Sequence, residues 1–249
     1  MKKIIVFVLI NACTVLCCGN ESDISVYVKH TLSRFYLGSV GADFSDGNRS
    51  LSNEITLSKG DCYAGIWMAT GPGDAKYKKD WDPYIGFVHQ ISFFRYEATA
   101  TYFVLSNLAR MNDDLWSFDQ KISSTDKHAL RPYVKIRAFN KVGSRSIESG
   151  WFGWIGCENR QPFGKADLNT DLSVAYSDGP SGKTPGLVYC RLTTGLSYPL
   201  TKTLTVTPSL IYQVPTANQR HVRSPFVTKD QFVWGISIGY PLCFKKGTK

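Results

Sequence analysis

The feature that most constrains this chain is the alternation of apolar with polar or small side chains along most of its length. The alternation is clearest near the C-terminus, where apolar residues occupy every second position of 232–244. Gly235, Ser237 and Gly239 lie between them. A period of two is typical of β-strands, and few segments have the 3.6-residue period of a helix. The sequence therefore predicts an all-β fold.

The alternating segments predict about twelve strands, with ten or fourteen as alternatives because 105–130 and 158–167 fit the pattern less well. Their connections tend to alternate in length. Short turns are expected at Gly60-Asp61, near Arg95-Tyr96 and at Pro199 to Lys202, and longer polar loops at 38–50, 71–82, 178–186 and 214–230. Long connections on one side and short ones on the other are typical of outer-membrane barrels. No linker divides the chain, so a single barrel domain is expected.

Alternation alone does not distinguish a membrane barrel from a soluble one, which buries its apolar face inside. Two details favour the membrane. Aromatic residues fall near the predicted strand ends, as interfacial girdles do: Trp67, Tyr84, Trp116, Tyr198 and Tyr240. The last strand resembles the assembly signal of outer-membrane barrels through Ile236, Ile238, Tyr240 and Phe244, although a basic tail follows it.

The N-terminus is typical of a secretory signal peptide. Lys2 and Lys3 form a positive region, an apolar run follows, and Cys17 and Gly19 fit positions −3 and −1 of a cleavage site. We expect residues 1–19 to be removed and 20–249 to form the barrel. Cys13 or Cys18 as a lipoprotein acceptor remains an alternative. The apolar run is too short to span a membrane comfortably, and no other stretch approaches ~18 apolar residues.

Four cysteines remain after residue 19, and their spacing contains no CxxC pair. Free thiols facing the barrel wall are expected, with disulfides as the alternative: Cys62, Cys157, Cys190 and Cys243. The four histidines also lack the spacing of metal ligands. We therefore expect no metal and no cofactor.

One motif raises the question of an enzyme. Residues 235–239 read GISIG, which matches the G-x-S-x-G elbow of serine esterases with Ser237 as nucleophile. That elbow needs a helix after the serine and an acid and a histidine as partners. After Ser237 only a strand pattern and Pro241 follow, with no Asp, Glu or His. We expect no catalytic residue and no enzyme activity.

The N-terminal third resembles the TorF-type porin family of Gram-negative outer membranes. The resemblance rests on SRFYLGS (33–39), on the segment 46–71 that contains CYAGIW, and on WDPYIGF (81–87). The matching residues are Tyr63, Gly65, Trp67, Asp82, Tyr84 and Gly86, whereas Leu37 replaces the arginine of the family motif. The resemblance covers roughly residues 24–90 and implies an outer-membrane barrel with a pore and no catalytic residues.

Charged residues on the polar faces of the strands are the candidates for lining a pore. They are Lys29, Glu97, Lys121, Lys135, Arg137 and Arg191. In a water-filled lumen such cations favour anionic solutes. In a lumen filled by side chains, these charged residues would only form ion pairs with oppositely charged neighbours on the same inner face. A barrel of about twelve strands is intermediate in size between filled eight-stranded barrels and open sixteen-stranded porins. The strand number therefore does not show whether the lumen is open.

These features predict an outer-membrane porin for the passive diffusion of small hydrophilic solutes, with a preference for anions. Two alternatives stay open: a non-conducting structural or surface-interaction barrel, and a soluble secreted barrel that binds an apolar ligand. The expected partners are outer-membrane lipids, lipopolysaccharide and the barrel-assembly machinery. The net charge of +9 favours anions, but nothing in the sequence indicates nucleic acid.

Overall fold

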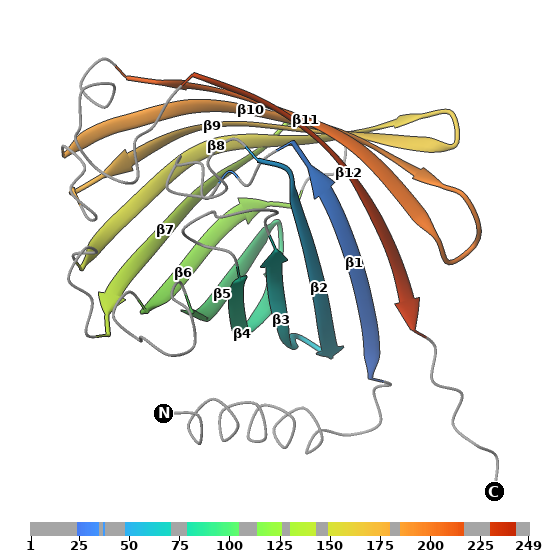
Figure 1. Ribbon diagram of the computed structural model, residues 1–249, viewed down its shortest axis with the longest axis horizontal. Coiled ribbons are helices and arrows are strands. Elements are labelled where there is room, and N and C mark those ends of the chain that lie inside the picture. The colour runs from blue at the N-terminus through green and yellow to red at the C-terminus, as the bar shows by residue number, and fades with distance from the viewer. Residues whose placement is uncertain are drawn as a thin grey trace, which may run out of the picture.

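A computed structural model describes residues 24–34, 37, 48–70, 79–104, 114–125, 130–142, 149–179, 185–216 and 230–242. These residues form twelve antiparallel strands closed into one barrel, so the predicted fold is confirmed (Figure 1). The strands are β1 (Ser25–Ser33), β2 (Ser50–Lys59), β3 (Cys62–Thr70), β4 (Lys79–Ile91), β5 (Phe94–Phe103), β6 (Leu115–Ser124), β7 (Arg131–Lys141), β8 (Gly150–Phe163), β9 (Ala166–Ser177), β10 (Gly186–Pro199), β11 (Thr205–Pro215) and β12 (Gln231–Leu242). Among the described residues, no helix is long and apolar enough to cross a membrane.

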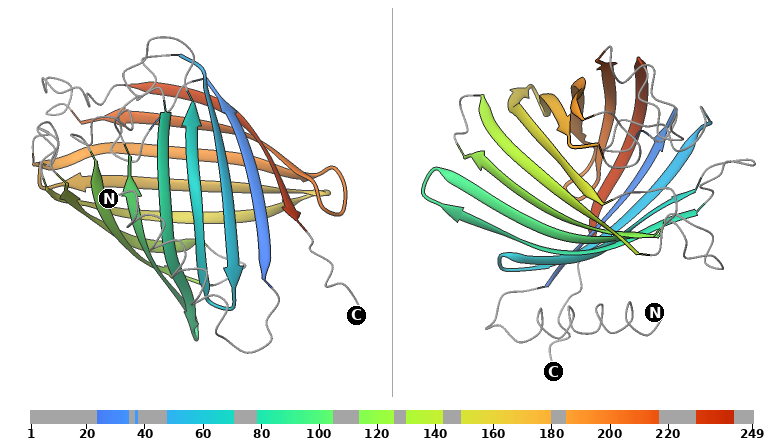
Figure 2. Two further views of the ribbon diagram at one scale, coloured as in Figure 1. Left: turned by 60° about the horizontal axis from the view of Figure 1, so that its bottom comes forward. Right: turned by 90° about the vertical axis from the view of Figure 1, so that its left-hand side faces the viewer.

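Each strand pairs with its neighbour in the chain, and β1 pairs with β12 to close the sheet (Figure 2). Tight turns join β2 to β3, β4 to β5 and β8 to β9. Gly60, Ser92 and Gly164 begin these turns with φ angles of 56°, 52° and 64°, which tight hairpin turns require. We call this the short-turn end of the barrel and the opposite end the long-loop end. The turn expected near Arg95-Tyr96 lies at Ser92-Phe93 instead.

The two faces of the wall differ sharply in polarity, as β12 illustrates. Ile236 and Ile238 point outward and are each 41% exposed, whereas Ser237 between them points inward and is 9% exposed. Large apolar side chains cover the outer face of other strands in the same way. Polar and small residues predominate on the inner face. The barrel is therefore apolar outside and polar inside, the inverse of a soluble protein.

The last strand carries the predicted assembly residues on one face. Ile236, Ile238 and Tyr240 lie on the outer side of β12, whereas Phe244 falls outside the described residues. The described cysteines are free thiols and lie on the outer face of the wall: Cys62, Cys157 and Cys190. Cys243 also falls outside the described residues.

Two of the predicted girdle residues are placed wrongly. Trp67 and Tyr84 point inward, since Trp67 pairs with Glu54 across the ladder and the Tyr84 hydroxyl donates to Glu54 at 2.9 Å. The other three predicted girdle residues lie on the outer face, together with further aromatics such as Trp151, Trp234 and Phe94. The alternating pattern is also broken in β10, where a register shift between Leu187 and Tyr189 turns Val188 inward.

Inward tyrosines lie across glycines of the neighbouring strands. Tyr63 covers Gly86 and Tyr84 covers Gly65, so β3 and β4 interlock reciprocally. A Cβ atom added to Gly86 would lie 2.5 Å from the Tyr63 ring, closer than real contacts allow. These four residues are among those that carry the resemblance to TorF-type porins. The motif therefore has a physical meaning, because only glycine leaves room for the neighbouring ring.

The hydroxyl of each such tyrosine reaches one strand further, to an acid and a hydroxyl residue two positions apart. Tyr84 bonds Glu54 and Thr56, and Tyr63 bonds Glu97 and Thr99. Tyr133 repeats the arrangement across Gly156 with Asp171 and Ser173. Each unit thus ties three strands together on the inner face: β2 to β4, β3 to β5, and β7 to β9.

Replacing Gly156 with alanine is expected to destabilise the barrel. The added Cβ would lie 2.5 Å from the Tyr133 ring. Overpacking of this kind costs about 1–3 kcal/mol. Urea unfolding in detergent, followed by tryptophan fluorescence, measures the loss. Gly195→Ala is the matched control, because its nearest contact would be a Thr207 methyl group at 3.3 Å.

The double variant Gly156→Ala/Tyr133→Ala separates the clash from a general intolerance of β8. In the Tyr133→Ala background the added methyl group meets no ring, so the step from Tyr133→Ala to the double variant should cost much less stability than Gly156→Ala costs in the wild-type protein. Equal stability of the two alanine variants at Gly156 and Gly195 would contradict the interlocking role.

Candidate functional site

The six residues predicted to line a pore all lie on the inner face of the wall. Lys29 pairs with Gly239 on one side and Glu54 on the other, and Glu97 pairs with Lys121. Lys121 also pairs with Lys135, Arg137 with Asp119, and Arg191 with Gln213. Their inward orientation agrees with the alternation of the sequence, and their role in lining a pore stays a prediction.

Asp119 is the centre of one ion-pair group. Arg137 donates to it from Nε and Nη2, both at 2.5 Å, and Lys135 Nζ lies 2.8 Å away. The Asp119 side chain is 9% exposed and the Arg137 side chain 12% exposed, so this pairing takes place largely away from water. Two of the predicted cations are thus held by one acid that was not among the predicted site residues.

Glu158 is the centre of a second group. Lys121 forms an ion pair with its Oε1, and Arg131 approaches its Oε2 at 4.0 Å. The Lys121 and Glu158 side chains are 23% and 29% exposed, so water reaches this part of the inner face. Together, the carboxylates of Asp119 and Glu158 balance much of the positive charge on the inner faces of β6 and β7.

The remaining two cations lie apart from these groups. The Arg191 guanidinium donates to Gln213 Oε1 at 3.1 Å and 2.6 Å and lies over the Tyr189 ring at 4.5 Å. Lys29 forms no ion pair with any residue that the structure describes. Lys29 is therefore the best placed of the six to act on a solute, and Arg191 lies outside the two carboxylate-centred groups.

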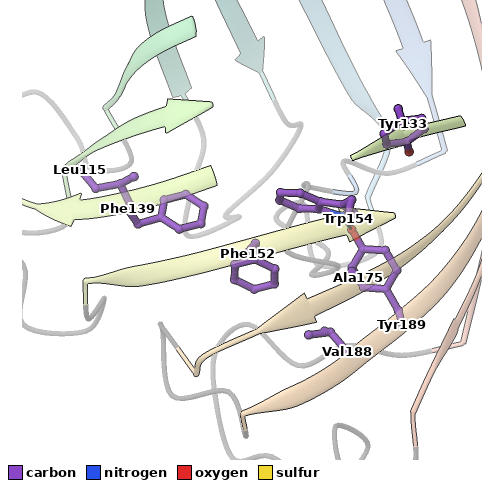
Figure 3. Close-up of a cluster of buried hydrophobic side chains, with 8 residues drawn as sticks. All are labelled: Leu115, Tyr133, Phe139, Phe152, Trp154, Ala175, Val188 and Tyr189. Carbon is purple, nitrogen blue, oxygen red and sulfur yellow. Dashed lines mark hydrogen bonds between the residues drawn. The ribbon is translucent and has the colours of Figure 1, made fainter. Parts of the chain in front are cut away.

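An apolar cluster lies inside the barrel, which the sequence pattern did not predict (Figure 3). Phe152 is stacked on Trp154 with ring centroids 5.7 Å apart and meets Phe139 edge-on at 5.9 Å. Trp154 Nε1 donates to the Tyr189 hydroxyl at 2.8 Å. The cluster comprises Leu115, Tyr133, Phe139, Phe152, Trp154, Ala175, Val188 and Tyr189, from β6 to β10.

The cations border this cluster. The Lys135 ammonium lies 5.6 Å from the centre of the Trp154 ring, and the Arg137 guanidinium lies 5.6 to 5.9 Å from the rings of Phe103, Phe139 and Trp154. Such contacts stabilise a cation that has lost part of its hydration. The sequence of β8 contains a pattern that could have predicted the cluster, because apolar residues occur on both faces of WFGW, at 151–154.

Accessibility differs between the two ends of the lumen. Near the short-turn end, Lys29, Glu54, Glu97, Lys121 and Asp171 are partly exposed. Toward the long-loop end the inner residues of β2 to β12 form a continuous buried belt. They are Ser50, Ala69, Asp80, Asp82, Thr101, Leu115, Ser117, Phe139, Phe152, Ala175, Ser177, Val188, Tyr189, Gln213, Gln231 and Val233, each 9% exposed or less.

Ser237 has no catalytic surroundings among the described residues. Its hydroxyl pairs with Thr31 Oγ1 at 2.9 Å on the inner face. The nearest histidine in the ladder, His30, lies on the outer face, where it bonds Asn53 at 2.7 Å and Tyr240 at 3.2 Å. The described residues also contain no group of three or more metal-ligating side chains.

No protein-family model matches the chain, and no curated protein matches it. Solved structures do match. The KdgM porin in complex with disordered oligogalacturonate has a TM-score of 0.54 at 10% identity, over 89% of this chain and 99% of that one. The NanC porin has a TM-score of 0.53 at 10% identity, over 87% and 100%. An outer membrane channel from Pseudomonas putida F1 has a TM-score of 0.52 at 9% identity, over 90% and 97%.

At such identities the likeness establishes the fold alone. The chain shares the architecture of outer-membrane porins over nearly the whole length of those proteins. The likeness does not distinguish the TorF-type family from other porins.

Replacing Asp119 with asparagine is expected to destabilise the barrel strongly. The change leaves Arg137 and Lys135 beside a neutral amide in a partly desolvated site. Removing one partner of a buried ion pair costs about 3 kcal/mol or more. Urea unfolding in detergent measures the effect. Asp167→Asn is the control, since its pair with Arg160 is exposed, and it should leave the unfolding midpoint unchanged. Similar midpoints for both variants would contradict this role of Asp119.

Proposed function

We propose that this protein is a porin of a Gram-negative outer membrane, through which small hydrophilic solutes diffuse passively. The observation that carries the proposal is the polarity of the wall, apolar outside and charged inside, in a closed twelve-stranded barrel. An exposed apolar surface of this extent is unfavourable in water and favourable in lipid. The partly exposed charges at the short-turn end supply a hydrated lumen.

Several finer assignments belong to this proposal. Residues 1–19 act as a cleaved signal peptide and 20–249 form the barrel in the outer membrane. Lipids and lipopolysaccharide surround the barrel, and the assembly machinery recognises its last strand through Ile236, Ile238, Tyr240 and Phe244. The interlocked Tyr63, Gly65, Tyr84 and Gly86 support membership of the TorF-type family.

The proposed solutes include anions, with Lys29 and Arg191 as the residues that favour them. Arg191 is bound by a neutral amide and an aromatic ring. Lys135, Arg137 and Lys121 contribute less, because Asp119 and Glu158 balance their charge. The KdgM structure holds an oligogalacturonate, which is an anionic sugar chain. That observation supports an anion as the solute here without identifying it.

The second candidate function is a non-conducting barrel with a structural or surface-interaction role. The buried belt and its apolar cluster favour this candidate, because they fill much of the inner face toward the long-loop end. A soluble ligand-binding barrel is disfavoured by the apolar exterior. An enzymatic function is disfavoured by the surroundings of Ser237.

Purified protein inserted into a planar lipid bilayer should give discrete conductance steps. In a salt gradient the reversal potential should indicate a preference for anions. The variant Lys29→Gln/Arg191→Gln should reduce that preference by about threefold in permeability ratio, as expected for removing two charges from a wet lumen. Arg160→Gln is the control, since its side chain is 62% exposed on the hairpin formed by β8 and β9, and it should leave the ratio unchanged. Folded protein that never conducts would favour the second candidate.

Location is tested by fractionation. The protein should appear in outer membranes and should migrate faster on gels before boiling than after, as closed barrels do. Deleting 231–249 should abolish the fast-migrating form, because β1 would lose its partner. Recovery of the intact protein as soluble periplasmic material would support the soluble barrel instead.

A further inference from the structure

A solute that crosses this barrel must pass the buried belt, and the two sides of the belt differ. From β6 to β10 the belt consists of the apolar cluster around Phe152 and Trp154. From β11 through β12 to β4 its members are smaller or polar, among them Gln213, Ser50 and Asp80. Aromatic side chains in contact leave no room for water. A hydrated path through the belt is therefore expected on its polar side.

Three buried oxygen atoms in the belt find no hydrogen-bond partner among the residues that the structure describes. They are Asp80 Oδ1, Asp82 Oδ1 and Gln231 Oε1, and all three lie on the polar side. Asp80 and Asp82 are 2% and 4% exposed. A buried polar atom without a partner is costly, and in native proteins it is normally satisfied by water or an ion. These atoms mark the places where the belt needs water.

The polar groups on the aromatic side are satisfied within the protein. Trp154 donates to the Tyr189 hydroxyl, and Arg191 is held by Gln213. The described residues hold no cluster of three metal ligands near the acids, so a dedicated metal site is not indicated. No described residue satisfies the Oδ1 atoms of Asp80 and Asp82, and water or a mobile ion can do so.

We propose that the hydrated path through the long-loop half of the barrel runs past Asp80 and Asp82, and that this acid pair attracts cations and opposes anions there. The inference rests on the proposed function, because it requires a conducting barrel. Both side chains project from the inner face of β4, two residues apart, and a hydrogen bond joins them. Such a bond requires a shared proton, so the pair carries about one negative charge. Among the described residues, Arg137 is a cation whose charge acts on Asp82, and it is already bound by Asp119.

The lumen then has two sections of opposite preference. Lys29 and Arg191 favour anions in the accessible section. Asp80 and Asp82 resist them in the buried belt. The anion preference of the whole pore is the balance of the two, so removing the acid pair should increase it.

The test is a reversal-potential measurement in planar bilayers with a potassium chloride gradient. The variant Asp80→Asn/Asp82→Asn should raise the permeability ratio of chloride to potassium by about threefold, consistent with the modest energy of an ion near charges in a wet pore. Asn has the size of Asp, so the unit conductance should change less than the ratio. Asp167→Asn, at the exposed end of β9, is the control and should leave the ratio unchanged. If the double variant does not show the gel shift of a folded barrel, the single variants Asp80→Asn and Asp82→Asn are measured in its place.

Thiol modification locates the path independently of charge selectivity. In a background in which the natural cysteines are serine, Asp82→Cys should be modified by a small charged methanethiosulfonate, with a loss of current. Phe152→Cys, on the aromatic side of the belt, should not respond.

The outcomes separate the two proposals. Wild-type conductance with an unchanged ratio in the double variant, or with a response at Phe152 but none at Asp82, overturns the path and leaves the porin function intact. Absence of conductance in the folded wild-type protein and in all variants overturns the porin function and the path with it.

Discussion

The rest of the structure depends on the pairing of backbone hydrogen-bonding groups in surroundings that offer no water. Within lipid every strand needs a partner on both sides, and only a closed sheet provides this. The pairing of β1 with β12 supplies the closure. Once the sheet is closed, alternate side chains have opposite environments. The division between the apolar exterior and the charged interior of this protein then follows.

The interior of this barrel is built by a few repeated contacts rather than by a continuous core. Tyrosine rings lie over glycines and reach an acid two strands away, and Asp119 gathers Arg137 and Lys135. The apolar cluster at β6 to β10 adds packing on one side only. The result is a lumen whose cross-section is asymmetric, with filled aromatic surfaces facing smaller polar ones. The open cross-section of such a lumen depends on which side the aromatic residues fill as much as on the number of strands.

Much of the fold was predictable because a two-residue period determines which side chains share a face. The strand number, the orientation of Lys135 and Arg137 and the outer face of β12 all follow from that period. It failed where both faces of a strand are apolar, as in β8, and where a bulge shifts the register, as at Val188. Trp67 and Tyr84 were assigned to a girdle because aromatic residues near strand ends suit that role. Their inward direction depends on contacts with Glu54 on another strand, which one sequence does not display.

The seam between the first and last strands has a consequence for biogenesis. Thr31 meets Ser237 inside the wall, and His30 meets Tyr240 outside it, across 206 and 210 residues of chain. No part of this contact can form until nearly the whole polypeptide has been synthesised. Up to that moment the sheet has two open edges, which readily pair with other chains. The final strand is the one that closes both edges, so the order of synthesis leaves them open until the last part of the chain is made.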